Sequence, residues 1–186
     1  MNTKHLIIIS SLWILVIALS LAWNHYIVES HTLKLVGNKA KAFFDEIVIT
    51  RNWNSLHGGV YVPIDSLTQP NSYLNDPLRD IETINGMKLT KVNPSFMTRQ
   101  IAEINKSKND LQFHITSLKP IRPENKPDDW ERKALLAFEN KEQEFLELVE
   151  NDSSSLYRYM APLITEESCL KCHAIQSYKV GDIRVE

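Results

Sequence analysis

Cysteine is scarce in this sequence: its 186 residues include only Cys169 and Cys172. A structural zinc site needs about four thiol or imidazole ligands, so zinc here would have to recruit distant histidines. An excess of positive charge is also lacking, because 21 lysines and arginines face 23 acidic residues and give a formal net charge of −2. A surface without a basic field does not hold a nucleic-acid backbone. Nucleic acid is therefore not expected as a partner.

The one long apolar run lies at the N-terminus. Residues 6–23 carry no charge, and a run of this length is about the minimum for a membrane-spanning helix. Lys4 precedes the run and Glu29 is the first charge after it, so the positive-inside rule places the N-terminus in the cytoplasm. We expect residues 1–24 to be a single-pass inner-membrane anchor and the rest to face the periplasm. A signal peptide cleaved near Ala22 is the alternative, and it also exports the chain.

Residues 25–186 have the composition of one mixed domain, since 43% of the chain is apolar and can form a packed core. The periodicities and turn signals predict, in chain order, a helix at 27–51, strands at 59–64 and 86–92, a helix beginning at Asn93 and Pro94, a strand at 111–118, a proline-rich loop, a helix at 128–149 and a strand at 156–164. This order predicts an α+β domain with a small antiparallel sheet. The first helix is expected to continue from the membrane anchor.

Both cysteines fall in one short motif, Cys169-Leu-Lys-Cys172-His173. Cys-x-x-Cys-His is the attachment motif of c-type heme. The two thiols meet the two vinyl groups, and the adjacent imidazole reaches the iron from one face. The motif predicts one covalent heme with thioethers from Cys169 and Cys172 and His173 as the proximal ligand.

Other readings of the same thiols are less favoured. A thioredoxin-like dithiol usually opens a helix after a strand, and a histidine placed directly behind it adds nothing to that chemistry. A disulfide across so short a loop would constrain the unfolded chain little. Export favours heme further, because heme is attached to such motifs on the outer side of the membrane.

Four segments in order resemble a known family: "RNWNSLHGGVYVP" at 51–63, "LTKVNPSFMTRQI" at 89–101, "HITSLKPIRPENKPDDWE" at 114–131 and "YRYMAPLITEESCLKCHAIQSYKVGDIR" at 157–184. They are similar to the extracytoplasmic, PAS-like single-heme sensor domain that precedes bacterial histidine kinases and diguanylate cyclases. A cyanobacterial c-type heme protein with histidine and cysteine axial ligands is a more distant relative. The resemblance covers nearly all of residues 25–184.

The resemblance implies a PAS-like fold with a long N-terminal helix and a five-stranded antiparallel sheet around one c-type heme. Family members usually continue after residues 181–184 with a glycine-rich turn and a further strand, so we expect the domain here to be truncated at its C-terminal strand. Sensors of this family also carry an output module, and no kinase or cyclase sequence is present in these 186 residues. PAS-like sensors often dimerise, which implies a homodimer.

The sixth iron ligand is less constrained by the sequence. In the distant relative it is a cysteine near the end of the first helix, and His57 lies in that neighbourhood here, followed by Gly58 and Gly59, which let a backbone approach a flat macrocycle. His57 is therefore the preferred ligand, with a helix-capping turn histidine as the alternative. The remaining candidates are His114, Met97, Met160 and an open or water-bound position.

Heme propionates require cations nearby. Arg99, Lys119 and Arg122 come from segments that the resemblance puts around the pocket, and we expect Arg99 and Arg122 in particular to contact the heme. Each could equally be a solvated surface charge.

Two functions of different classes follow. The first is a membrane-tethered heme sensor that responds to the oxidation state of the iron, through a redox partner, or to a diatomic gas. The second is a monoheme electron carrier. Ordinary small cytochromes c carry the motif near the N-terminus, whereas here it begins at Cys169 after several predicted strands, and this favours the sensor. No nucleophile and base pair stands out near the motif, so the chain is not expected to be an enzyme.

Overall fold

The computed structural model describes residues 2–106, 111–151, 154–170 and 177–183. The chain divides into two compact units, residues 1–42 and 43–186. An α+β fold with a long N-terminal helix and small antiparallel sheets is confirmed. The domain boundary predicted after residue 24 stays a prediction.

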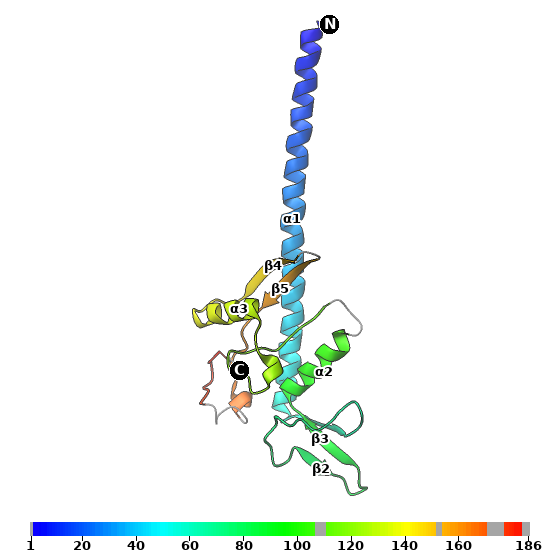
Figure 1. Ribbon diagram of the computed structural model, residues 1–186, viewed down its shortest axis with the longest axis vertical. Coiled ribbons are helices and arrows are strands. Elements are labelled where there is room, and N and C mark those ends of the chain that lie inside the picture. The colour runs from blue at the N-terminus through cyan, green and yellow to red at the C-terminus, as the bar shows by residue number, and fades with distance from the viewer. Residues whose placement is uncertain (1, 107–110, 152–153, 171–176, 184–186) are drawn as a thin grey trace. The chain divides into compact units, whose positions relative to one another are not determined.

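Helix α1 (Thr3–Leu56) is the longest element (Figure 1). No proline precedes Pro63, so nothing in this stretch removes a helical hydrogen bond. An 18-residue window within the helix has a mean hydropathy of 2.5, which makes it long and apolar enough to cross a membrane. An N-terminal signal sequence satisfies the same test.

Two glycines end α1. Gly58 and Gly59 have φ of 73° and 96°, a conformation that only glycine adopts without strain. Their backbone N–H groups donate to Ser55 O and Asn54 O, which satisfies carbonyls left over at the helix end. A side chain on Gly59 would also collide with Lys91, since its Cβ would lie 2.8 Å from Lys91 Cγ. The chain can therefore turn sharply into the first strand.

Strands β1 (Val60–Pro63), β2 (Asp80–Glu82) and β3 (Lys88–Val92) form an antiparallel sheet in the order β1-β3-β2. The predicted strands at 59–64 and 86–92 correspond to β1 and β3 and are confirmed, whereas β2 was not predicted. Helix α2 (Pro94–Lys106) follows at once. The predicted start is confirmed, because Asn93 Oδ1 accepts from Phe96 N at 2.9 Å in the manner of an N-cap.

The predicted strand at 111–118 is wrong. In the structure this segment has no regular secondary structure and belongs to no sheet. Its polar groups bond instead to the proline-rich loop, where Thr116 Oγ1 and Ser117 N donate to Asn125 O at 3.0 and 3.3 Å. The loop contains the short helix η1 (Pro123–Asn125).

Helix α3 (Asp129–Glu139) begins as predicted. Asp128 Oδ1 accepts from Glu131 N while Glu131 Oε2 accepts from Asp128 N, which is a complete capping box. The prediction that this helix runs to residue 149 is wrong. Asn140 terminates it, and Lys141 has φ of 71°, outside the helical region.

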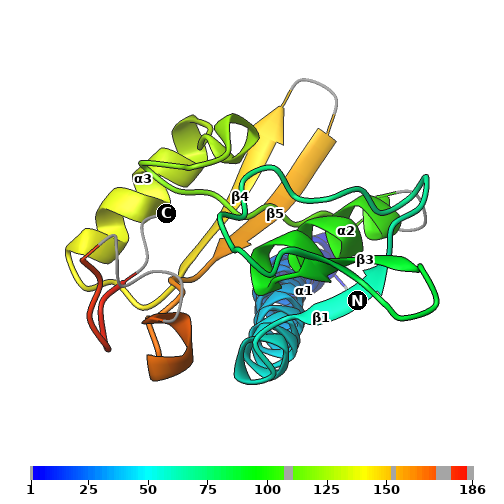
Figure 2. The same ribbon diagram turned by 90° about the horizontal axis from the view of Figure 1, so that it is seen from below.

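The residues after α3 form the hairpin β4 (Phe145–Asn151) and β5 (Ser154–Met160), with Phe145 opposite Met160. The predicted strand at 156–164 thus starts earlier and ends before Pro162. The described strands form one three-stranded and one two-stranded sheet, and Figure 2 shows β4 and β5 apart from β1 and β3. The single five-stranded sheet implied by the resemblance is therefore wrong for the described residues.

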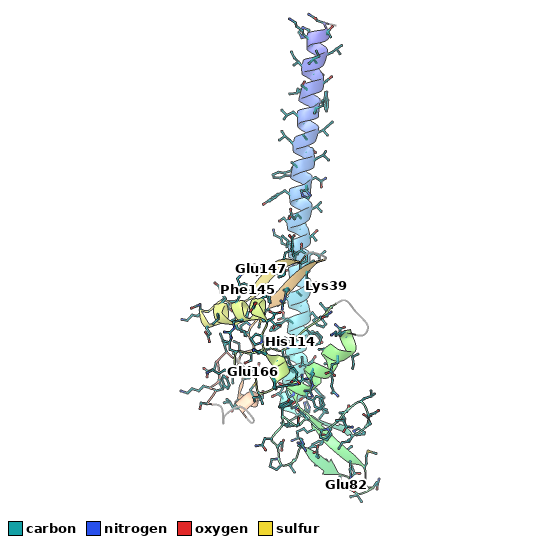
Figure 3. The ribbon with its side chains drawn as sticks, viewed as in Figure 1. Lys39, Glu82, His114, Phe145, Glu147 and Glu166 are labelled. Carbon is teal, nitrogen blue, oxygen red and sulfur yellow. The ribbon has the colours of Figure 1, made fainter. Side chains whose placement is uncertain are left out.

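The hydrophobic core lies on α3. Ala134, Leu135 and Phe138 are at most 3% exposed. The partly buried apolar side chains that pack against them are Leu118, Trp130, Phe145, Met160 and Ile183. Two residues of β4, Phe145 and Glu147, contact Trp130 of α3 and are labelled in Figure 3. The centroids of the Phe145 and Trp130 rings lie 5.4 Å apart, and Trp130 Nε1 donates to Glu147 Oε2 at 2.8 Å. This core therefore joins α3, the β4–β5 hairpin and the C-terminal segment.

Candidate heme site

The heme motif lies on a loop whose two ends are joined. Ile164 and Ile183 form an antiparallel bridge. Thr165 N donates to Asp182 O at 2.8 Å, and Gly181 N donates to Thr165 O at 2.9 Å. Ile183 also packs against the core on α3. The loop at 166–180 is thus closed at its base by backbone hydrogen bonds and attached there to the core.

Cys169 ends a single turn of 3₁₀ helix, η2 (Glu167–Cys169). Its thiol is free and partly exposed, and among the described residues Sγ accepts one long hydrogen bond, from Glu166 N at 3.4 Å. A thiol of this kind is accessible for attachment and fits the first thioether. Cys172 and His173 lie outside the described residues, so their predicted roles stay predictions.

Two buried hydroxyl groups lie just before the motif in the sequence. Thr165 is 1% exposed, and neither its Oγ1 nor Ser168 Oγ has a hydrogen-bond partner among the described residues. Leaving a buried polar group unsatisfied costs about 1–3 kcal/mol. A prosthetic group attached at Cys169 would bring new polar atoms to this part of the loop, so the two hydroxyls fit such a group.

His57 follows the last residue of α1 and is exposed. Its Nδ1 lies 2.7 Å from Trp53 O, and its ring lies 4.5 Å from the Trp53 ring, centroid to centroid. A carbonyl oxygen can only accept, so Nδ1 carries the proton. In the neutral imidazole this fixes Nε2 as the nitrogen with a free lone pair. Iron-ligating histidines have this arrangement, in which one nitrogen donates to a backbone carbonyl and the other binds metal.

His114 has both ring nitrogens engaged. Nδ1 lies 2.9 Å from Glu131 Oε1, and Nε2 lies 3.1 Å from Glu124 O. Both partners accept, so the geometry favours the doubly protonated ring, and the hydrogen bond to Glu131 raises the pKa of His114 above its ordinary value. In this arrangement no lone pair is left for iron.

The two candidate methionines lie in packing positions. Met97 is half-buried on α2, and its sulfur is 3.6 Å from Asn54 Nδ2, a fully buried amide of α1. Met160, at the end of β5, packs against the core on α3. Within the described residues no group of three or more His, Cys, Asp or Glu side chains could hold a metal ion.

The structure brings Arg99 and Arg122 to one pocket, between α2, the loop 67–73 and the segment around η1. Lys119 is exposed and does not line this pocket. The two arginines thus line the same pocket, and their predicted contact with heme stays a prediction.

A comparison with protein families shows which family this chain belongs to. The model of the Tll0287-like family matches residues 29–184, which is most of the chain. The chain belongs to the Tll0287-like family. This family is associated with heme, in agreement with the motif and with the resemblance seen in the sequence. No curated protein and no solved structure matches the chain significantly.

The Tll0287-like match begins after the apolar run and includes the whole motif loop. Inspection of the sequence did not find the base of this loop, the bridge between Ile164 and Ile183. No local signal could have found it, because the two residues lie on opposite sides of the motif and pair only in the folded chain. The bond of Glu131 to His114 was also missed, because the two residues lie 17 positions apart and meet only in the folded chain.

The pair of His114 and Glu131 predicts a pH dependence of stability in this Tll0287-like domain. The folded pKa of His114 is raised above its ordinary value of 6.5, so the pair stabilises the fold fully below pH 6.5. This contribution is lost as the pH rises through the folded pKa. We expect the difference in free energy of unfolding between the wild type and His114→Gln, measured by urea titration, to shrink as the pH rises from 5 to 8. A difference that grows over that range would contradict the assignment.

Proposed function

We propose that this chain carries one covalent c-type heme in a membrane-tethered, periplasmic domain and acts as a redox or gas sensor. Cys169 and Cys172 form the thioethers, and His173 is the proximal ligand. The N-terminal part of α1 is the single inner-membrane anchor. Heme supplies an iron that can change oxidation state or bind a diatomic gas, and the residues of this chain hold and report that change. No catalytic role is proposed.

The observation that carries the proposal is the motif on a loop with a closed base. The bridge of Ile164 with Ile183 holds the two ends of the loop together, and Ile183 joins them to the core on α3. A macrocycle attached at two points of such a loop is held on the folded domain and does not swing with a free terminus. The match to a heme-associated family supports the same conclusion.

His57 is the proposed sixth ligand. Its Nδ1–H donates to Trp53 O and its Nε2 is free for iron, whereas both nitrogens of His114 are engaged. The contact with the Trp53 ring restricts the imidazole further. Restricting the ring in the free protein lowers the entropy that ligation costs.

The position of His57 also favours a sensor over a plain electron carrier. Three residues before it, Asn54 donates to Val92 O at 3.1 Å, and Arg51 donates to Thr98 Oγ1 at 2.9 Å. These buried contacts attach the end of α1 to β3 and α2. Release or capture of His57 by iron would therefore act on the end of α1 and on its two neighbours together. The signal is a diatomic gas or a redox partner, and the sensor is expected to act as a homodimer.

Optical spectra of heme-loaded protein test the ligand. We expect wild type to be low-spin in the ferric and ferrous states, because two strong-field ligands hold the iron. His57→Ala is expected to become high-spin when reduced and to bind carbon monoxide. His114→Ala is the matched control and should keep the wild-type spectrum, because its imidazole is already engaged.

A ferrous wild type that is high-spin and takes up carbon monoxide would contradict ligation by His57 and leave the gas sensor as the better function. Amide hydrogen exchange at Arg51 and Asn54 can be compared between the ferric and ferrous states. If the iron stays low-spin and the exchange rates are the same in both states, the electron carrier is the better function.

A further inference from the structure

A pocket of about 320 Å³ lies beside α2, away from the described part of the heme loop. Its walls are the loop 67–73, four side chains of α2 including Arg99 and Gln100, and Arg122 with Glu124. No described residue after Glu124 lines it. Pockets of about 300 Å³ and more accommodate small organic ligands.

Arg99 stacks on Phe96, and both residues line the pocket. Its guanidinium carbon lies 4.5 Å from the centroid of the Phe96 ring, and Phe96 is itself 6% exposed. Within the described residues the guanidinium has no hydrogen bond and no ion pair. Stacking on an aromatic ring fixes the plane of the guanidinium and leaves its N–H donors directed outward from that ring.

Arg122 adds a second positive charge to the same pocket. Its Nε lies 3.2 Å from Glu124 Oε2, and Glu124 is 60% exposed, so the pair is a weak surface contact. Burial and then the charge of Arg122 lower the pKa of Arg99, while Glu103 and Glu124 act in the opposite direction. The lining thus holds two guanidinium groups and two carboxylates; Arg122 is paired with Glu124, whereas Arg99 forms no ion pair in the described residues.

The loop 67–73, which lines another part of the pocket, is held by hydrogen bonds. Asn71 is 8% exposed, and its Oδ1 accepts from Tyr73 N at 3.2 Å. Gln100 Nε2 donates to Thr68 Oγ1 at 3.1 Å and so ties the loop to α2. A pocket with hydrogen-bonded walls and two guanidinium groups in its lining offers an anion charged hydrogen-bond donors.

We infer that this pocket binds a small organic carboxylate through Arg99 and Arg122. Guanidinium groups recognise carboxylates with two parallel hydrogen bonds, and a volume of about 320 Å³ leaves room for a body of several heavy atoms beside Phe96 and Tyr73. The proposal takes a free carboxylate as the ligand, and the test below distinguishes it from a heme propionate. The site would let a metabolite act on the same α2 that binds the end of α1.

The test uses the heme-loaded full chain in detergent and three probes, acetate, succinate and benzoate, titrated by calorimetry. We expect at least one probe to bind the wild type and to bind Arg99→Gln and Arg122→Gln roughly tenfold to a hundredfold more weakly, the usual value of a charge-assisted hydrogen bond. Arg99→Lys keeps the charge and should lose part of the affinity. Arg132→Gln, an exposed arginine of α3, is the matched control and should bind as the wild type does.

The reduction potential of the heme, measured on the same variants, separates the two sources of carboxylate. A free site predicts that Arg99→Gln leaves the potential unchanged in the absence of probe. A shifted potential together with no binding of any probe would overturn the inference and assign Arg99 to a propionate. Absence of Arg99-dependent binding without such a shift would overturn it as well.

Discussion

Replacing Cys169 and Cys172 together by alanine is expected to leave the chain with no covalently bound heme. Both thioethers of the motif are removed, and the chain has no other cysteine to replace them. The free heme that remains can be held only by coordination and packing, and it is lost when the protein unfolds. Heme staining after a denaturing gel, and the intact mass of the chain, should show complete loss of the adduct.

A single cysteine variant tests one thioether at a time. Cys169→Ala should retain one thioether and keep the adduct mass, with an altered hemochrome spectrum. Ser66→Ala, which removes an exposed hydroxyl outside the motif, is the control and should keep full heme attachment. A double cysteine variant that still carries heme after denaturation would refute attachment through this motif.

Features set by local residues could be predicted from the sequence. The start of α2 depends on Asn93 and Pro94, and the start of α3 on Asp128 and Glu131, so each signal lies within four residues of what it determines. Caps of this kind need no tertiary contact, which is why the starts of α2 and α3 were predicted correctly. The end of α1 was not: the helix was predicted to end at residue 51 and ends at Leu56.

Strand β4 shows where local reasoning fails. In "FLELVEN" the apolar residues Phe145, Leu148 and Val149 have helical spacing, yet Phe145, Glu147 and Val149 also have the period of a strand. The pairing with β5 and the contacts of Phe145 and Glu147 with Trp130 decide between the two. These partners lie on other elements, so a single segment could not reveal the outcome.

The candidate heme site likewise has features that could be predicted from the sequence and features that could not. The heme motif is contiguous and could be recognised directly, whereas the arrangement that distinguishes His57 from His114 depends on neighbours. One of these neighbours, Trp53 O, lies four residues away along a helix, and the other, Glu131, lies 17 residues away in sequence. The sequence made both histidines candidates. Only the contacts show which imidazole has a free nitrogen.

The core on α3 connects stability with the heme site. Phe138 is 1% exposed in that core, and Ile183, at the base of the motif loop, packs against the same cluster. A cavity in the cluster should therefore weaken both the fold and the support of the loop. This coupling makes heme attachment a second readout of a core substitution.

Phe138→Ala is accordingly expected to lower the free energy of unfolding by about 3–5 kcal/mol, the usual cost of truncating a fully buried phenylalanine. Leu136→Ala, two residues away on the same helix and 45% exposed, should cost less than about 1 kcal/mol. Urea unfolding followed by far-ultraviolet circular dichroism measures both. Because Ile183 loses part of its packing surface, Phe138→Ala should also show less attached heme per chain than Leu136→Ala. Equal heme content in the two variants, with the stability loss present only in the first, would mean that the closed base of the loop holds its shape without the core.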